Sequence, residues 1–280
     1  MVYDINGNVI TESKTPADRF SELINFNYQR DETSGAFYTV LNVPMINNKG
    51  EKQYPFVIWP DYPNGGTQST LQMNLSKKYI VAVNGGRYSE PYGAGVTVTG
   101  IPKGTVIQNS VVLQQGVSGN YNPTLDVVLT IDNNGKLGYA NPLDSASELV
   151  NNGVVSAVTG FVPILSGYEN IEDVVGDTPT WISYVNRVDD SQHQVIGQYD
   201  NGDYAIITTE GRTYQGGGWF TVKQTQELCK RLGLKDAFML DGGGSTETVV
   251  GQRQLNPFYD NVYGRINPTF IVFNGTTVFG

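Results

Sequence analysis

Cysteine and histidine are almost absent from this sequence of 280 residues. Cys229 is the only cysteine, so neither an internal disulfide nor a multi-cysteine metal site can form. It lies in a predicted helix beside Leu228 and Leu232, where a small buried apolar group is expected. His193 is the only histidine, which excludes zinc sites built on several imidazoles. A Ser-His-Asp triad would have to use His193, and no Gly-x-Ser-x-Gly motif accompanies it.

Positive charge is scarce as well. The chain has 18 basic and 27 acidic residues and a formal net charge of −9, which argues against nucleic acid or an anionic membrane surface as its principal partner. No apolar run approaches the roughly 20 residues that span a bilayer. The amino terminus, Met1 to Gly7, lacks the basic and apolar regions of a signal peptide, so export through the general secretory route is not expected.

Short runs rich in Val, Ile, Thr and Tyr recur from residue 35 onward, separated by stretches rich in Asn, Asp, Gly and Pro. Such runs, bounded by turn-forming residues, predict β-strands. The first strands predicted in this way cover 36–43, 54–59, 79–83, 95–99 and 125–131. Because helical patterns are fewer, we predict an α+β fold of mostly antiparallel or mixed sheets covered by a few helices.

Two stretches further along the chain predict β-hairpins. One joins 127–131 to 136–139 through an Asp-Asn-Asn-Gly turn. The other joins 194–199 to 204–209 through Asp-Asn-Gly-Asp.

The clearest helix is predicted over 221–232. Thr221 and Gln224 have the spacing of a capping box, and Gly233 is placed to end the helix in a left-handed turn. A strand over 234–240 is expected to follow.

We predict two units, a helical lead-in or attachment segment over 1–35 and a domain over 36–280. The sequence of 15–18, Thr-Pro-Ala-Asp, is typical of a helix start, and apolar residues follow over 20–28 at near-helical spacing. Such a segment is either an attachment arm or a packed first element.

The most informative stretch is an apolar strand over 237–240 that runs into Asp241, three glycines and two hydroxyl residues at 242–246. Ordering consecutive glycines costs conformational entropy, which a fold tolerates where a Cβ would collide with an approaching ligand. The alternative is an ordinary glycine-rich turn.

A second strand end has the same design. The apolar residues 81–83 run into Asn84, Gly85, Gly86 and Arg87. Two such ends indicate two walls of one cleft, or else two unrelated turns.

Two further candidates are less specific. Glu210 and Arg212 carry opposite charges near a turn, where either a site or a surface ion pair explains them. His193 begins a predicted strand and is either a site residue or a structural hydrogen-bonding group.

The order and spacing of these motifs resemble the phosphodiester glycosidase family. The resemblance covers roughly Lys78 to Phe273 and is most specific between Gly211 and Val250. It rests on Asn84-Gly85-Gly86, Gly197, Gly211-Arg212, the helix over 221–232 and Leu240 to Ser245. It implies a hydrolase that cleaves the bond between the anomeric carbon of a sugar and a phosphodiester.

The stretches 245–248, 254–256 and 264–274, with the opening residues, are similar to versions encoded by bacteriophages of Gram-positive hosts. Those versions are commonly tail or minor structural proteins. One departure is that many members carry Arg-Thr where this chain has His193-Gln194, which either weakens anion recognition or shifts it to His193, Arg212 or Arg265.

The resemblance implies roles for the candidate residues. Asp241 is expected to be the catalytic base, nucleophile or metal ligand, with Glu210 as second carboxylate and His193 as a further catalytic or phosphate-binding group. The expected substrate-binding residues are Asn84, Gly85, Gly86, Arg87, Arg212, Gly242, Gly243, Gly244, Ser245, Thr246 and Arg265. The spacing demands no cofactor, and a divalent cation, calcium or magnesium, held by Asp241 and Asn84 is a hypothesis.

The implied substrate is a glycosyl phosphodiester of a bacterial cell-wall glycopolymer such as teichoic acid. The expected location is a phage tail in the virion, acting at the host cell surface beside other tail proteins, and a homo-oligomer is compatible with this. One alternative is a non-catalytic glycan-binding or structural tail or baseplate component. Another is a non-viral glycosidase.

Overall fold

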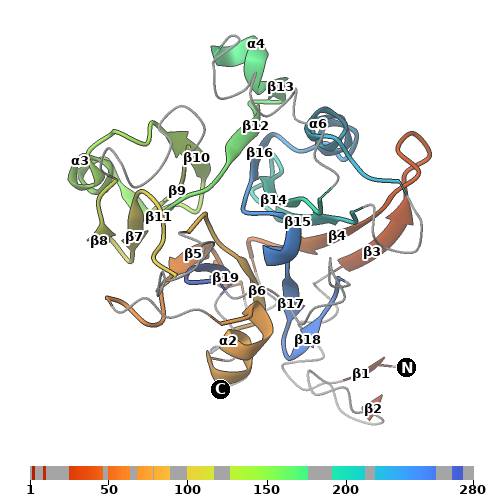
Figure 1. Ribbon diagram of the computed structural model, residues 1–280, viewed down its shortest axis with the longest axis horizontal. Coiled ribbons are helices and arrows are strands. Elements are labelled where there is room, and N and C mark those ends of the chain that lie inside the picture. Colours follow the sequence, from red (N-terminus) through yellow and green to blue (C-terminus); the bar gives the residue numbers. More distant parts are fainter. Residues whose placement is uncertain are drawn as a thin grey trace, which may run out of the picture.

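The computed structural model describes residues 2–3, 9–10, 25–46, 50–63, 68–77, 79–88, 100–116, 127–175, 191–211, 218–256 and 267–273. Every strand pair in these ranges is antiparallel. Helices are few, so the predicted α+β class is confirmed (Figure 1).

The largest sheet has seven strands. In spatial order they are β13 (Glu169–Asn170), β12 (Val162–Ser166), β16 (Asp236–Met239), β14 (Gln194–Gln198), β15 (Tyr204–Thr209), β4 (Phe37–Val43) and β3 (Asn25–Arg30). The predicted hairpin of 194–199 with 204–209 is the central pair β14–β15.

Two sheets have five strands each. One has the order β10 (Leu137–Ala140), β9 (Val128–Asp132), β11 (Val154–Thr159), β7 (Val106–Gln108) and β8 (Val111–Gln114). The other has the order β18 (Arg253–Gln254), β17 (Thr248–Val250), β6 (Val81–Asn84), β19 (Phe270–Phe273) and β5 (Pro55–Ile58). The strands β1 (Val2–Tyr3) and β2 (Val9–Ile10) form a separate pair, and the predicted hairpin β9–β10 is confirmed.

The described helices are α2 (Thr70–Lys77), α3 (Ala146–Asn151), α4 (Ile171–Val175) and α6 (Val222–Arg231), with a short 3-10 turn, η1 (Gly243–Ser245). Both halves of the predicted capping box are present at Thr221 and Gln224, and Gly233 has φ +79°. Leu228 and Cys229 are buried against the seven-stranded sheet, as expected for the inner face of α6. Among the described residues, no helix is long and apolar enough to cross a membrane.

All three large sheets contribute to one hydrophobic core. Ile206 of the seven-stranded sheet, Leu129 of one five-stranded sheet and Ile271 of the other belong to the same buried cluster. This shared core brings strand ends that are distant in sequence to one place (Figure 1).

The predicted amino-terminal helix is wrong where it can be checked. Asn25–Arg30 forms β3 and pairs with β4 along its whole length, because strand pairing overrides the weak helical spacing of residues 20–28. The helix start at 15–18 and the predicted strand 95–99 lie outside the described residues. The division into 1–35 and 36–280 stays a prediction, with β3 and β4 in one sheet.

Candidate active site

Three candidate residues lie at the same edge of the seven-stranded sheet. Asp241 follows the end of β16, Glu210 follows the end of β15, and His193 precedes the start of β14. Because β14 runs antiparallel to both neighbours, these three positions meet at one edge. Main-chain bonds continue the ladders there, from Leu240 N to Gln194 O at 2.8 Å and from Thr209 N to His193 O at 2.9 Å.

The glycine loop after Asp241 is shaped by its neighbours. A Cβ on Gly242 would lie 2.7 Å from the carbonyl oxygen of Gln192, and Gly243 has φ +59°, so a side chain is excluded at the first position and strained at the second. The Asp241 side chain is 8% exposed. The loop thus holds a largely buried carboxylate at the end of a buried strand.

The loop's amide groups divide into two sets. The N–H groups of Gly243, Ser245 and Thr246 donate to main-chain carbonyls at 2.8, 3.2 and 3.1 Å. For the N–H groups of Gly242 and Gly244, no acceptor lies among the described residues. Only this second pair is available to an incoming anion, fewer amides than the sequence predicts.

The second predicted wall does meet the first. Asn84, at the end of β6, donates from Nδ2 to the carbonyl oxygen of Asp241 at 2.7 Å, and its Oδ1 accepts from the N–H of Glu247 at 3.1 Å. Asp241 N also donates to Gly85 O at 3.2 Å. The Asn84 side chain is fully buried, so its amide holds the main chain of the Asp241 loop in place.

This arrangement bears on the predicted cation site. The Asn84 amide oxygen already accepts a hydrogen bond from Glu247 N, and the Asn84 side chain is buried. In the part of the chain that the structure describes, no group of three or more His, Cys, Asp and Glu side chains converges on a metal-sized space. A divalent cation held by Asp241 and Asn84 stays a prediction.

Gly85 and Gly86 serve packing. A Cβ on Gly85 would lie 2.7 Å from the main chain of Thr269, and one on Gly86 would overlap the carbonyl oxygen of Thr159. These glycines allow three strand ends to approach one another, rather than a ligand to approach the main chain.

Arg87 brings a cation to this edge. Its guanidinium lies over the Phe161 ring, 5.0 Å from the ring centroid, and Phe161 N donates to Met239 O at the end of β16. Arg87 is half-buried, and stacking on an aromatic face leaves the edges of a guanidinium able to donate hydrogen bonds.

His193 is buried between β14 and α6. Thr225 donates its single hydroxyl proton to Thr221 O at 3.0 Å, so its Oγ1 accepts from Nδ1–H of His193 at 2.7 Å. In the neutral ring this assigns the proton to Nδ1 and leaves Nε2 as the basic nitrogen. The expectation that a lone histidine forms structural hydrogen bonds agrees with this contact.

Glu210 is 4% exposed and accepts a hydrogen bond from the hydroxyl of Tyr28 at 2.5 Å. Burial raises the pKa of the Glu210 carboxyl, although the bond from Tyr28 acts to lower that pKa. Tyr28 lies in β3, and its ring stacks on Phe37 with centroids 5.1 Å apart. A carboxyl group that holds its proton to higher pH than usual therefore lies at this edge.

Sequence reasoning missed Glu247. Its carboxylate is 1% exposed and accepts from the first amides of α2, Thr70 N at 2.6 Å and Leu71 N at 3.1 Å. Burial raises the pKa of Glu247, while these backbone bonds lower it. The capping box of Ser69 and Gln72 marks the start of α2, but no local sequence signal connects Glu247 to it.

A buried polar network lies near the site. The Oε1 atom of Gln194 accepts from Thr248 Oγ1 at 3.2 Å, and Thr248 Oγ1 contacts Thr208 Oγ1 at 2.8 Å. The network joins β14 and β15 to β17 of a different sheet. Gln194 belongs to the His193-Gln194 pair that stands where many family members carry Arg-Thr. Here its side chain links strands of two different sheets.

Two remaining predictions concern hydroxyl groups. Ser245 and Thr246 are buried, and Thr246 Oγ1 faces the carbonyl oxygen of Gln192 at 3.5 Å. The hydroxyl of Thr246 is therefore directed at the protein's main chain. Arg212 and Arg265, the predicted phosphate-binding arginines, lie outside the described residues.

Residues 77–273 match the phosphodiester glycosidase family, and the chain belongs to this family. The family resemblance of the motifs is thereby confirmed. Over 261 residues the chain is 24% identical to the SPbeta prophage-derived uncharacterized protein YomE of Bacillus subtilis (strain 168). That match covers 89% of this chain and 38% of YomE, so the chain spans well under half of that relative.

Solved structures share the fold. The catalytic domain of zebrafish N-acetylglucosamine-1-phosphodiester alpha-N-acetylglucosaminidase, auto-inhibited by its pro-peptide, has a TM-score of 0.62 and 16% identity, covering 90% of this chain and 82% of that one. A hypothetical protein from Synechocystis has a TM-score of 0.62 and 12% identity, covering 90% and 62%. A putative exported protein from Burkholderia pseudomallei K96243 has a TM-score of 0.55 and 13% identity, covering 85% and 74%.

Proposed function

We propose that this chain hydrolyses the bond between the anomeric carbon of a sugar and a phosphodiester, at the sheet edge around Asp241. One observation carries the proposal: in a chain of the phosphodiester glycosidase family, the Asn84 segment and the Asp241 loop join around a largely buried carboxylate. A carboxyl group with a raised pKa, here Glu210, together with unengaged amides at one strand edge is typical of a catalytic site.

The chemistry sets what the site must supply. A phosphodiester leaves as a stable anion, so donors and cations that neutralise it matter more than a strong acid. The N–H groups of Gly242 and Gly244 and the guanidinium of Arg87 are suited to that task. The Asp241 carboxylate is suited to attack the anomeric carbon or to activate water.

Glu210 and His193 supply proton-transfer groups to the same edge. The raised pKa of Glu210 lets it keep a proton at a pH where an exposed glutamate has lost it, so it can donate to the departing oxygen. The Nε2 atom of His193 is the basic nitrogen of the neutral ring and is suited to accept a proton, but it is buried and so is not placed to pair with phosphate directly.

For the substrate we propose a glycosyl phosphodiester of a bacterial cell-wall glycopolymer such as teichoic acid, cleaved at the host surface by a chain carried in a phage tail. The support is the prophage-derived relative, together with the family's phosphodiester chemistry. The chain would then act in the virion beside other tail proteins, in a homo-oligomer or as a monomer.

The test is release of sugar. Purified protein is incubated with cell walls of a Gram-positive host, with and without a chelator, and free reducing sugar is measured. We expect release by the wild type and a loss of about 100-fold or more in Asp241→Asn, because an amide neither attacks nor activates water. The bonds from Asn84 and to Gly85 involve the main chain of Asp241, which the substitution leaves in place.

Glu227→Gln is the matched control, since it makes the same carboxylate-to-amide change at an exposed position of α6. It should release sugar at the wild-type rate. Tight binding to walls without any release by the wild type would instead establish a glycan-binding or structural tail component. Release unaffected by Asp241→Asn would remove Asp241 from the mechanism.

A further inference from the structure

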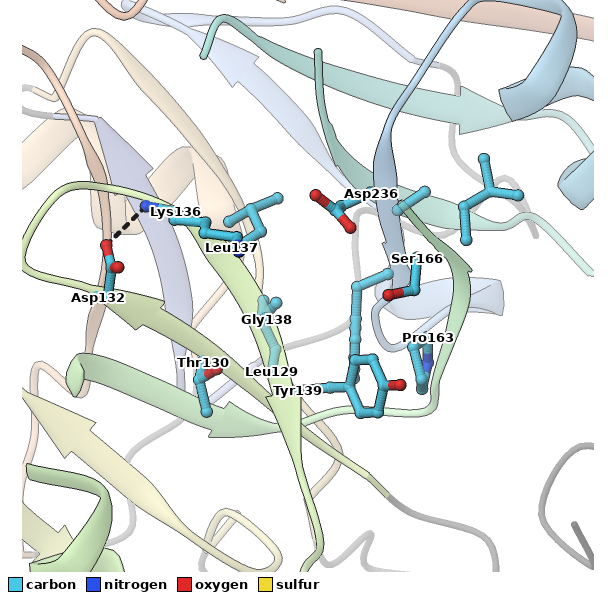
Figure 2. Close-up of a pocket in the computed structure, with 13 residues that line it drawn as sticks. Leu129, Thr130, Asp132, Lys136, Leu137, Gly138, Tyr139, Pro163, Ser166 and Asp236 are labelled. Atoms are coloured by element: carbon cyan, nitrogen blue, oxygen red, sulfur yellow. Dashed lines mark hydrogen bonds between the residues drawn. The ribbon is translucent and has the colours of Figure 1, made fainter. Parts of the chain in front are cut away.

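A pocket of about 340 Å³ lies between two sheets (Figure 2). One wall is formed by β9 and β10, of which β10 is the outermost strand of its five-stranded sheet, and the other is formed by β12 and β16. Asp236, at the start of β16, lines the pocket, whereas Asp241 follows the end of that strand. At about 3.3 Å per residue the two aspartates are roughly 15 Å apart, so the pocket is a separate place on the molecule.

The wall formed by β10 presents main-chain groups. Only one side of β10 is paired, with β9. On its other side Leu137 N donates to Gln198 Oε1 at 3.0 Å, and Gln198 Nε2 donates to Gly135 O at 3.2 Å. Because main-chain groups alternate sides along a strand, the N–H and C=O of Tyr139 lie on this same open side. Within the described residues no such cap reaches Tyr139, whose polar groups are left for a ligand.

The opposite wall presents an acceptor. One oxygen of Asp236 accepts from Gly167 N at 3.0 Å, which fixes the carboxylate and leaves its other oxygen free to accept. Figure 2 shows Asp236 and Ser166 facing β10 across the pocket. The Tyr139 ring is 37% exposed and forms a rim that a ligand can stack on.

Charge and shape select the ligand. The lining holds two carboxylates, Asp132 and Asp236, against one ammonium, Lys136, in a chain of net charge −9, so an anion is disfavoured. An added peptide strand is disfavoured too, because Gln198 already occupies the open side of β10 at Leu137 and the strand is only four residues long. The pocket offers an open main-chain amide, a carboxylate and a tyrosine ring. A ligand matches all three when its hydroxyl groups both donate and accept hydrogen bonds and its ring has apolar faces.

We propose that this pocket binds a neutral sugar unit. Its volume lies within the range of roughly 300–1,000 Å³ that small-molecule pockets occupy. Binding here would hold a glycan on the protein at a distance from the Asp241 edge, and it requires no hydrolysis. The inference therefore stands or falls independently of the proposed enzymatic function.

The test uses the full chain and saturation-transfer NMR with glucose, galactose and N-acetylglucosamine, and with glucose 1-phosphate as the anionic probe. We expect saturation transfer to at least one neutral sugar and about five-fold or greater weakening in Tyr139→Ala and in Asp236→Asn. Tyr62→Ala removes another exposed tyrosine, outside the pocket, and should bind as the wild type does.

Three results would overturn the proposal. The first is no saturation transfer to any neutral sugar in wild-type protein whose fold is verified by circular dichroism. The second is sugar binding that Tyr139→Ala leaves intact. The third is binding of glucose 1-phosphate alone, weakened by salt and by Lys136→Ala, which would make the pocket an anion site.

Discussion

The two glycine-rich strand ends of this protein have similar sequences but different physical roles. After β6, Gly85 and Gly86 are glycines because neighbouring main chains occupy the space of their side chains. After β16, Gly242 is likewise crowded by the carbonyl oxygen of Gln192, but Gly243 is a glycine because its backbone is left-handed, and the amides of Gly242 and Gly244 beside it are unengaged. The polar residue that precedes each pair differs as well, since the Asn84 amide forms internal hydrogen bonds to the main chain while Asp241 contributes a largely buried carboxylate.

Under the proposed function, the strand end at Asn84 supports the loop and the strand end at Asp241 carries the reactive carboxylate. The side-chain amide of Asn84 forms its hydrogen bonds to main-chain atoms of Asp241 and Glu247. It therefore fixes the position of the loop, and these bonds do not involve the carboxylate. A glycine-rich segment therefore indicates either a backbone crowded by its neighbours or a backbone in a left-handed conformation. Only the three-dimensional packing shows which of the two applies.

The largest expected effect is on the free energy of unfolding, at the glycine pair that follows β6. Gly86→Ala would push a methyl group into the carbonyl oxygen of Thr159, which belongs to a sheet and cannot move aside. We expect a loss of about 3 kcal/mol in the free energy of unfolding, measured by urea denaturation. Gly243→Ala, whose added methyl would lie 3.6 Å from Ser191, should lose only about 1–2 kcal/mol from the left-handed backbone. Equal losses would contradict the distinction between the two ends.

The next prediction distinguishes the effect of Asn84 on the position of the Asp241 loop from its effect on stability alone. Asn84→Ala leaves Asp241 O and Glu247 N without their buried partner, and we expect a loss of about 2–4 kcal/mol together with loss of sugar release. Asn74→Ala is the matched control, because Asn74 is an equally buried amide bonded to the main chain of Tyr79 and Gly251. It should cost similar stability but spare the activity of the folded fraction. Equal activity in both variants at a temperature where both are folded would show that Asn84 does not position the loop.

Much of the scaffold could be predicted from sequence because its signals are local. Alternation, turn composition and the capping box at Thr221 predicted β14, β15 and α6. The convergence of the Asn84 and Asp241 segments was also predicted, from two strand ends of one design. What the glycines and hydroxyls do there was not predictable, since the obstacle at Gly86 is Thr159 and the acceptor for Thr246 is Gln192, both distant in sequence. Glu247 was missed for the same reason, because its partners are in a helix far from it in sequence.

The smallest expected effect tests whether Glu210 takes part in the proposed catalysis. Burial raises its pKa in the folded protein above the unfolded value, so the stability it contributes is present at low pH and is lost as pH rises through the folded pKa. The bond from Tyr28 opposes this shift, so Tyr28→Phe should raise the pKa of Glu210 further and cost about 1 kcal/mol of stability, chiefly above the folded pKa, where the carboxylate is charged.

The measurement is a carboxyl NMR titration, with the Glu210 signal identified by its absence in Glu210→Gln, and urea denaturation at several pH values. Tyr199→Phe, which removes a hydroxyl bonded to Asn42, should leave that titration unchanged. In an active enzyme the pH profile of sugar release should move upward with the Glu210 pKa, whereas a purely structural Glu210 would change its titration and leave the profile in place.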